Sequence, residues 1–260
     1  MVIMKAVILC GGIGTRLKEE TEFRPKPLVE IGGMPILWHI MKIYSHYGVK
    51  DFVLCLGYKG ELIKKFFMEL DTHNSDFTYN PMTKKIEYHN DGDAEDWNIT
   101  FAETGSDTNT GARIKMIEKY IDEDNFHLTY GDGVADIDIN KLIDFHANHG
   151  KIGTVTAVRP MSKFGVLDID GDKVIDFSKK NLAHDGRVDG GFFVFNKKIF
   201  DYLSTDKDCI LEGEPLKRLA VDNQFVAYRH DGFWQCMDTI RHAEILNEMW
   251  LEKRALWKIW

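Results

Sequence analysis

Short apolar runs alternate with helical patterns along most of this chain, and this alternation limits its fold more than any other feature. The run at 52–56 is continuously apolar, as expected of a strand that is buried on both faces of a sheet. Residues 35–47 instead place apolar side chains at helical spacing, with Pro35 near the start and Gly48 at the end. Repetition of such units predicts an α/β fold with a mostly parallel sheet and helices on both faces.

The remaining expected elements follow the same two patterns until the period changes near Phe164. Further strands are expected at 5–10, 99–102, 126–130, 152–158, 191–195 and 225–228, and further helices at 62–70, 112–120, 139–147, 215–221 and 239–256. Residues 164–169 and 173–177 flank an Asp-Gly turn, which predicts a β-hairpin insertion. No linker rich in proline or serine interrupts the chain, so we expect a single domain over residues 1–260.

The composition narrows the classes of function. A content of 44% apolar and 28% charged residues is typical of a soluble globular protein. The net charge of −8 argues against nonspecific nucleic-acid binding, and no apolar run reaches the length of a membrane span. The four cysteines are scattered without a C-x-x-C pair, which favours reduced thiols and a cytoplasmic location.

A glycine-rich segment directly follows the first expected strand. It reads Gly11-Gly12-Ile13-Gly14-Thr15-Arg16, and Arg24-Pro25-Lys26-Pro27 comes shortly afterwards. Backbone N–H groups of such a loop can converge on an anion, and Arg16 and Lys26 would add positive charge there. The spacing matches neither a P-loop nor a dinucleotide-binding fingerprint, which would require a small residue in place of Leu17. The segment therefore predicts nucleotide binding of another kind.

Two aspartates follow expected strands. Asp132 lies between glycines just past strand 126–130, and Asp238 precedes the last helix. Carboxylates at strand ends suit Mg²⁺, although a Gly-Asp-Gly triplet alone is equally consistent with a turn. His146 and His149 stand at helical spacing without a third ligand nearby, so we expect ordinary hydrogen-bonded or surface histidines there.

The motif GG-x-GTRL followed by P-K-P resembles the N-terminal signature of the sugar-phosphate nucleotidyltransferases. Other segments look like one branch of that family, the glucose-1-phosphate cytidylyltransferases; they include GYKG, NITFAETG, TG-AR-K, LTYGDGVADIDI, GGFFVFN, GFWQ-MDT and LWKIW. The resemblance covers essentially the whole chain. It implies a Rossmann-like, mixed but mainly parallel sheet and Mg²⁺-dependent transfer of CMP from CTP to a sugar 1-phosphate. It also implies a homo-oligomer, with a hexamer as one form.

The resemblance further implies roles for individual residues. Nucleotide binding is implied for Leu9, Cys10, Gly11, Gly12, Ile13, Gly14, Thr15, Arg16, Lys26, Thr108, Arg113 and Gly131. Catalytic roles are implied for Arg16, Lys26, Arg113 and Asp132, and Mg²⁺ binding for Asp132 and Asp238. The acceptor would contact Lys179, Asp189 and Gly191.

Two positions near the expected acceptor pocket depart from the family pattern. Ser178 stands where the family has glutamate, and Asp189 where it has asparagine. One interpretation is neutral sequence drift, in which neighbours such as Asn181 supply the hydrogen bonds that the pocket would otherwise lose. Another is a different acceptor, for example an amino sugar phosphate. A catalytically silent regulatory homologue and a preference for another pyrimidine also stay open.

The C-terminus is rich in apolar side chains, and two interpretations of it stay open. The apolar side chains are those of Trp250, Leu251, Leu256, Trp257, Ile259 and Trp260. They either form a subunit interface or pack against the chain's own sheet.

Overall fold

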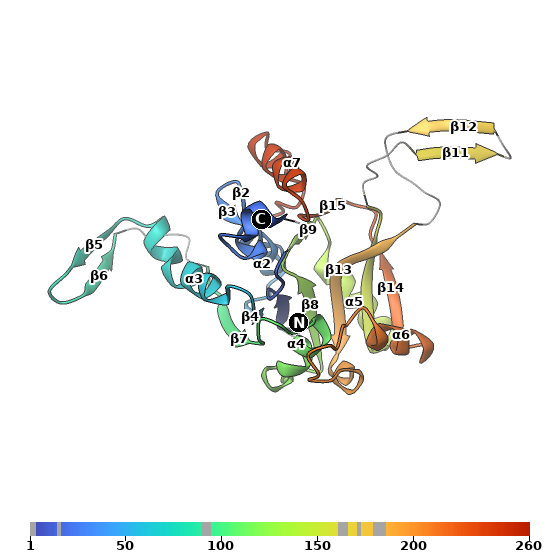
Figure 1. The fold of residues 1–260 in the computed structure, drawn as a ribbon, viewed down its shortest axis with the longest axis horizontal. Helices are drawn as coiled ribbons and strands as arrows, with labels where there is room; N and C mark the ends of the chain where they lie inside the picture. Colours follow the sequence, from blue (N-terminus) through green and yellow to red (C-terminus); the bar gives the residue numbers. More distant parts are fainter. Residues whose placement is uncertain (1–3, 15–16, 90–94, 161–165, 171–172, 179–185) are drawn as a thin grey trace.

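The computed structural model describes residues 4–14, 17–89, 95–160, 166–170, 173–178 and 186–260, and a mixed sheet forms its centre (Figure 1). The seven strands lie in the order β14 (Phe225–Arg229), β10 (Gly153–Val158), β13 (Val188–Asn196), β8 (Asn125–Tyr130), β1 (Ala6–Leu9), β4 (Asp51–Leu56) and β7 (Asn98–Glu103). Every neighbouring pair is parallel except the two that contain β13, which runs antiparallel to β10 and β8. The predicted mixed, mainly parallel sheet is confirmed.

The expected helices are present, with two of them shorter than predicted. They are α2 (Ile36–His46), α3 (Gly60–Asn74), α4 (Thr110–Met116), α5 (Ile139–His149), α6 (Glu214–Val221) and α7 (Ile240–Leu251); the short helix α1 (Lys18–Thr21) was not predicted. The helix expected at 112–120 continues past Met116 only as a 3₁₀ turn, η3 (Glu118–Tyr120). The helix expected at 239–256 ends at Leu251, because Lys253 adopts a φ of 55° that an α-helix cannot continue. Within the described ranges, no helix has both the length and the apolar character needed to cross a membrane.

Apolar residues cover both faces of the sheet, as predicted. Alternate side chains of a strand point to opposite faces. Accordingly, Ala6 and Ile8 of β1 join a core formed with α2, whereas Val7 and Leu9 join a second core formed with α4. Both cores are fully desolvated at their centres, so β1 is held rigidly at the point where it enters the glycine-rich segment.

The C-terminal tryptophans pack against the body of the molecule. Trp257 is fully buried, and the rings of Trp250 and Trp260 lie 4.8 and 6.0 Å from the ring of His39 in α2. Leu251 and Leu256 remain 78% and 58% exposed. Intramolecular packing, one of the two expectations for this segment, is therefore confirmed for its tryptophans.

Two β-hairpins stand away from the sheet (Figure 1). The hairpin of β11 (Val166–Asp170) and β12 (Lys173–Ser178) is the one predicted from the Asp-Gly turn. The hairpin of β5 (Phe77–Asn80) and β6 (Lys85–Tyr88) was not predicted. All eight of its strand residues are exposed, so burial imposes no alternation on their sequence. The short pair β2 (Glu30–Ile31) and β3 (Met34–Pro35) also escaped prediction, since two residues carry no periodicity.

Candidate active site

Two short strands bring together carboxylates that are far apart in the sequence. β9 (Gly133–Ala135) pairs antiparallel with β15 (Trp234–Cys236). Asp132 precedes β9 and Asp238 follows β15, and the N–H of Met237 donates to the carbonyl of Asp132 at 2.8 Å. Both aspartates thus emerge next to the carboxyl end of β8, the edge at which ligands bind in open α/β sheets.

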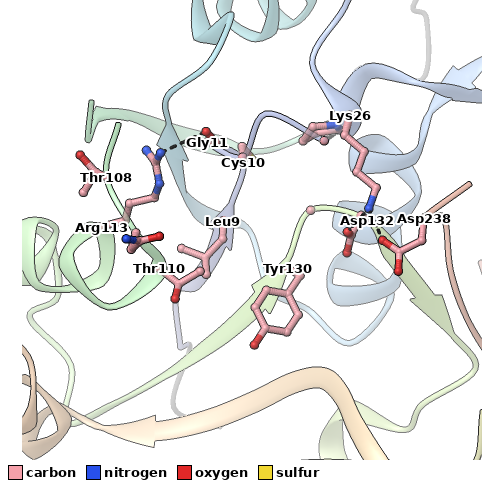
Figure 2. A pocket seen from close by; sticks show the side chains of 15 residues that line it. Leu9, Cys10, Gly11, Lys26, Thr108, Thr110, Arg113, Tyr130, Asp132 and Asp238 are labelled. Atoms are coloured by element: carbon pink, nitrogen blue, oxygen red, sulfur yellow. Dashed lines mark hydrogen bonds and ion pairs between the residues drawn. The ribbon is translucent and has the colours of Figure 1, made fainter. Parts of the chain in front are cut away.

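Lys26 lies between these carboxylates (Figure 2). Its Nζ is 2.6 Å from Oδ2 of Asp132 and 2.6 Å from Oδ1 of Asp238. Burial lowers the pKa of Lys26, but attraction and hydrogen bonds to the two carboxylates outweigh it and leave the pKa raised. The ammonium group therefore keeps its charge, and the two carboxylates already converge on a cation.

The carboxylate pair has the oxygen donors that a divalent cation requires. In the described part of the chain, no group of three or more His, Cys, Asp or Glu side chains is arranged around a common metal position. Water and phosphate oxygens would have to complete the coordination shell, which is usual for Mg²⁺. The residues fit a metal that is shared between protein and substrate.

Arg113, a residue of α4, stabilises the glycine-rich segment through hydrogen bonds (Figure 2). The residue is 4% exposed, and its guanidinium donates to the carbonyls of Gly11, Leu56 and Gly105 at 3.0, 3.0 and 2.6 Å. It also donates to Oγ1 of Thr104 at 2.7 Å. A Cβ at position 11 would lie 2.2 Å from the guanidinium, so glycine is required there. This positioning role was not foreseen, and the predicted catalytic role of Arg113 stays a prediction.

A pocket of about 320 Å³, here called the loop pocket, opens between the glycine-rich segment, the start of α4 and the end of β8. It brings together these predicted residues: Leu9, Cys10, Gly11, Gly12, Gly14, Lys26, Thr108, Arg113, Gly131, Asp132 and Asp238. Its lining also includes Pro27, Asn109, Thr110 and Tyr130, which the sequence did not single out. Ile13 is 55% exposed and does not line the pocket, while Thr15 and Arg16 lie outside the described residues.

A second pocket of about 310 Å³, here called the sheet pocket, shares Tyr130 with the loop pocket. It is lined by Thr129, Tyr130, Asp132, Gly133, Asp189, Gly190, Gly191, Trp234, Cys236 and Asp238. The predicted acceptor residues Asp189 and Gly191 are thus present, whereas Lys179 and Asn181 lie outside the described residues. Because Tyr130, Asp132 and Asp238 line both pockets, ligands in the two pockets would meet at the carboxylates.

The cysteines and paired histidines offer no competing chemistry. All four cysteines are free, as predicted, and Cys10 and Cys236 line the pockets. Burial raises the pKa of both thiols, that of Cys236 to about 11, which disfavours the nucleophilic thiolate. Nδ1 of His146 and Nε2 of His149 each lie 2.8 Å from Oγ1 of Thr154, so both are hydrogen-bonded histidines, as predicted.

Three functional candidates, Tyr130, Trp234 and Glu212, were not predicted from the sequence. Tyr130 directly precedes Gly131 at a strand end, and this position was an available signal. Trp234 donates from its indole to the carbonyl of Gly190 at 2.7 Å and shapes the sheet pocket. Glu212, which contacts Tyr130, lies before α6 with no motif around it.

Comparison with known proteins identifies the family. Residues 5–244 match the sequence model of the nucleotidyl transferase family. The chain is 48% identical to the glucose-1-phosphate cytidylyltransferase of Salmonella typhi over 99% of this chain and all of that protein. It is 47% identical to the probable glucose-1-phosphate cytidylyltransferase of Bacillus subtilis, with the same coverage.

A solved structure supports the fold. HddC from Yersinia pseudotuberculosis, complexed with GMP-PN, aligns with a TM-score of 0.70 at 24% identity, covering 95% of this chain and 99% of that one. This likeness concerns the Rossmann-like architecture alone. With the sequence relatives, the conclusion is that the chain belongs to the nucleotidyl transferase family and, within it, to the glucose-1-phosphate cytidylyltransferases.

Proposed function

We propose that this protein transfers CMP from CTP to glucose 1-phosphate and forms CDP-glucose and pyrophosphate. The observation that carries the proposal is the meeting of two pockets at Asp132 and Asp238, both of which form an ion pair with Lys26. A transferase for two phosphorylated substrates needs this arrangement, because both phosphates must reach one charged edge. Identity of 48% to a named glucose-1-phosphate cytidylyltransferase supports the choice of substrates.

The loop pocket is proposed to bind CTP. One side of it is the glycine-rich segment, whose N–H groups can donate to phosphate oxygens and base edges. We include Ile13, Thr15 and Arg16 in this site on the strength of the family resemblance. Arg113 supports the pocket by fixing the carbonyl of Gly11. The sheet pocket is then proposed to bind the sugar of the acceptor, with Lys179 on its phosphate.

The proposed reaction needs no general base. The acceptor phosphate is already an anion, and one of its oxygens bonds to the α-phosphorus of CTP while the bond to the β-phosphate oxygen breaks. The main obstacle is repulsion between two phosphates, so catalysis consists of positioning and charge neutralisation. The Lys26 ammonium supplies positive charge at the junction of the pockets.

Asp132 and Asp238 are proposed to hold Mg²⁺. The two carboxylates already converge on a cation, and they leave the other coordination positions to water and phosphate. When bound, a divalent ion neutralises negative charge that develops on the leaving pyrophosphate.

Assembly and location are proposals as well. We propose a homo-oligomer, with a hexamer as one form, that acts as one domain over residues 1–260 in the cytoplasm. The exposed apolar side chains of Leu251 and Leu256 support a subunit contact at the C-terminus. Light scattering at micromolar concentration that shows only a monomer would contradict it.

The proposed function is tested by measuring pyrophosphate release with each of four NTPs and a panel of sugar phosphates. The highest kcat/KM is expected for CTP with glucose 1-phosphate. Equal use of UTP or dTTP would contradict the cytosine preference. A better rate with an amino sugar phosphate would reassign the acceptor. Binding of Mg·CTP in a calorimeter without turnover would show a silent homologue.

A further inference from the structure

Tyr130 is shared by the loop pocket and the sheet pocket. It ends β8 and lines both pockets. Gly191 packs against its ring, because a Cβ at position 191 would lie 2.6 Å from Cδ2 of Tyr130, and the φ of Gly191 is +77°. Phe193 contacts the ring edge-on with centroids 5.9 Å apart. The ring therefore has a fixed position.

The hydroxyl of Tyr130 lies between two carboxylates. It is 2.5 Å from Oε1 of Glu212 and 3.2 Å from Oδ2 of Asp189. Burial raises the pKa of Tyr130, and both carboxylates raise it further, so the phenol keeps its proton. A phenol has one proton and can donate it to only one of the two. The shorter distance assigns that proton to Glu212.

Glu212 is itself held in place from the loop pocket. Its Oε2 accepts a hydrogen bond from Oγ1 of Thr110 at 2.7 Å. The N–H of Leu211 donates to the same Thr110 oxygen at 2.9 Å. The start of α4, which lines the loop pocket, thus fixes the carboxylate that receives the Tyr130 proton.

Asp189 is left with unused acceptor capacity. Its Oδ1 accepts from the N–H of Gly191 at 2.7 Å. In the described ranges, the only donor near Oδ2 is the Tyr130 hydroxyl, whose proton points to Glu212. Asp189 lines the sheet pocket, so its Oδ2 can accept a hydrogen bond from a ligand there.

We infer that Glu212 is a specificity-determining positioning residue that acts through Tyr130. By holding the phenol proton, it keeps Asp189 available to a hydroxyl or ammonium donor on the acceptor's sugar ring. The inference rests on the proposed function, because it takes the sheet pocket as the acceptor site. Without the Glu212 charge, the phenol proton turns to the remaining carboxylate, since hydrogen bonds to charged groups are roughly twice as strong. The Tyr130 hydroxyl then donates to Asp189, which is no longer available to the acceptor.

The test compares Glu212→Gln, Tyr130→Phe and the double variant with CTP and glucose 1-phosphate. Glu212→Gln is expected to raise KM for glucose 1-phosphate on the order of tenfold, with kcat and KM for CTP nearly unchanged. Tyr130→Phe removes the competing proton, so its acceptor KM should rise less than that of Glu212→Gln. The double variant is expected to match Tyr130→Phe, because removal of the hydroxyl restores Asp189.

Tyr202 and Asp222 offer a matched control. The hydroxyl of Tyr202 donates to Oδ2 of Asp222 at 2.8 Å on the surface, and neither residue lines the loop or sheet pocket. Tyr202→Phe and Asp222→Asn therefore repeat the chemical changes without the expected effect.

The outcomes distinguish a failure of the inference on Glu212 from a failure of the proposed function. An unchanged acceptor KM in Glu212→Gln would overturn the inference, as would a double variant as impaired as Glu212→Gln. In either case, wild-type turnover of glucose 1-phosphate leaves the proposed function intact. Absence of CDP-glucose formation by the wild type would overturn both.

Discussion

The loop pocket and the sheet pocket share one edge but are built in different ways. One side of the loop pocket is the glycine-rich segment, which the buried Arg113 stabilises through the carbonyl of Gly11. The sheet pocket presents side chains, among them Asp189 and Trp234. The backbone N–H groups of a glycine-rich segment suit a ligand part that does not vary, such as phosphate, whereas a side chain such as Asp189 can change ligand preference by a single substitution. Selectivity for the acceptor should therefore reside in the sheet pocket.

The largest expected effect lies at the shared edge. Asp132→Asn and Asp238→Asn should each lower kcat on the order of a thousandfold, since electrostatic stabilisation of the reacting phosphates is lost. Folding should stay nearly intact, because the two side chains are 28% and 21% exposed. Steady-state kinetics and thermal melting measure both effects.

The double variant decides whether the carboxylates act together. Groups that act as a unit give non-additive losses, so the double variant should be little worse than either single one. Fully additive losses would show that the two carboxylates act independently and do not hold one shared ion. Asp122→Asn, at an 87% exposed surface position, is the control.

Lys26→Ala should have the next largest effect. Its charge matters most while phosphorus–oxygen bonds change, so kcat should fall about a hundredfold while KM for CTP rises less. Lys26→Gln should behave similarly, because it keeps polarity but not charge. If only KM for CTP changes, Lys26 serves ground-state binding in the loop pocket.

Arg113→Lys should affect the loop pocket more than the sheet pocket. Lysine lacks the planar fork, so buried carbonyls such as those of Gly11 and Leu56 lose donors at about 1–3 kcal/mol for each unpaired group. We expect a lower melting temperature and a KM for CTP raised about tenfold, with a smaller change for the acceptor. An equal rise of both KM values would remove the distinction between the pockets.

The smallest expected effect concerns the acceptor. Asp189→Asn removes a charge from the sheet pocket and should shift preference severalfold from amino sugar phosphates toward glucose 1-phosphate, because an ammonium donor loses more than a hydroxyl. Competition between the two acceptors measures this ratio. Exclusive use of glucose 1-phosphate by the wild type, unchanged by the substitution, would show that Ser178 and Asp189 reflect drift.

Local sequence predicted the parts of the site that follow buried strands. The continuous apolar strands and their periodic helices are visible because burial on both faces dictates them. The assembly of Asp132 with Asp238 depends on β9 and β15, which are three residues long and too short to show a period. Glu212 meets Tyr130 across 82 residues of sequence, so only the folded chain shows that contact. The exposed hairpin of β5 and β6 escaped prediction for lack of any burial pattern.

The most direct test follows the phosphorus atom itself. CTP labelled at the α-phosphate is incubated with the protein, Mg²⁺ and glucose 1-phosphate, and the products are separated and weighed by mass spectrometry. We expect the label to enter CDP-glucose, with one pyrophosphate released for each CDP-glucose formed, and only when both substrates are present. Label that appears in CMP at the same rate without glucose 1-phosphate would contradict it.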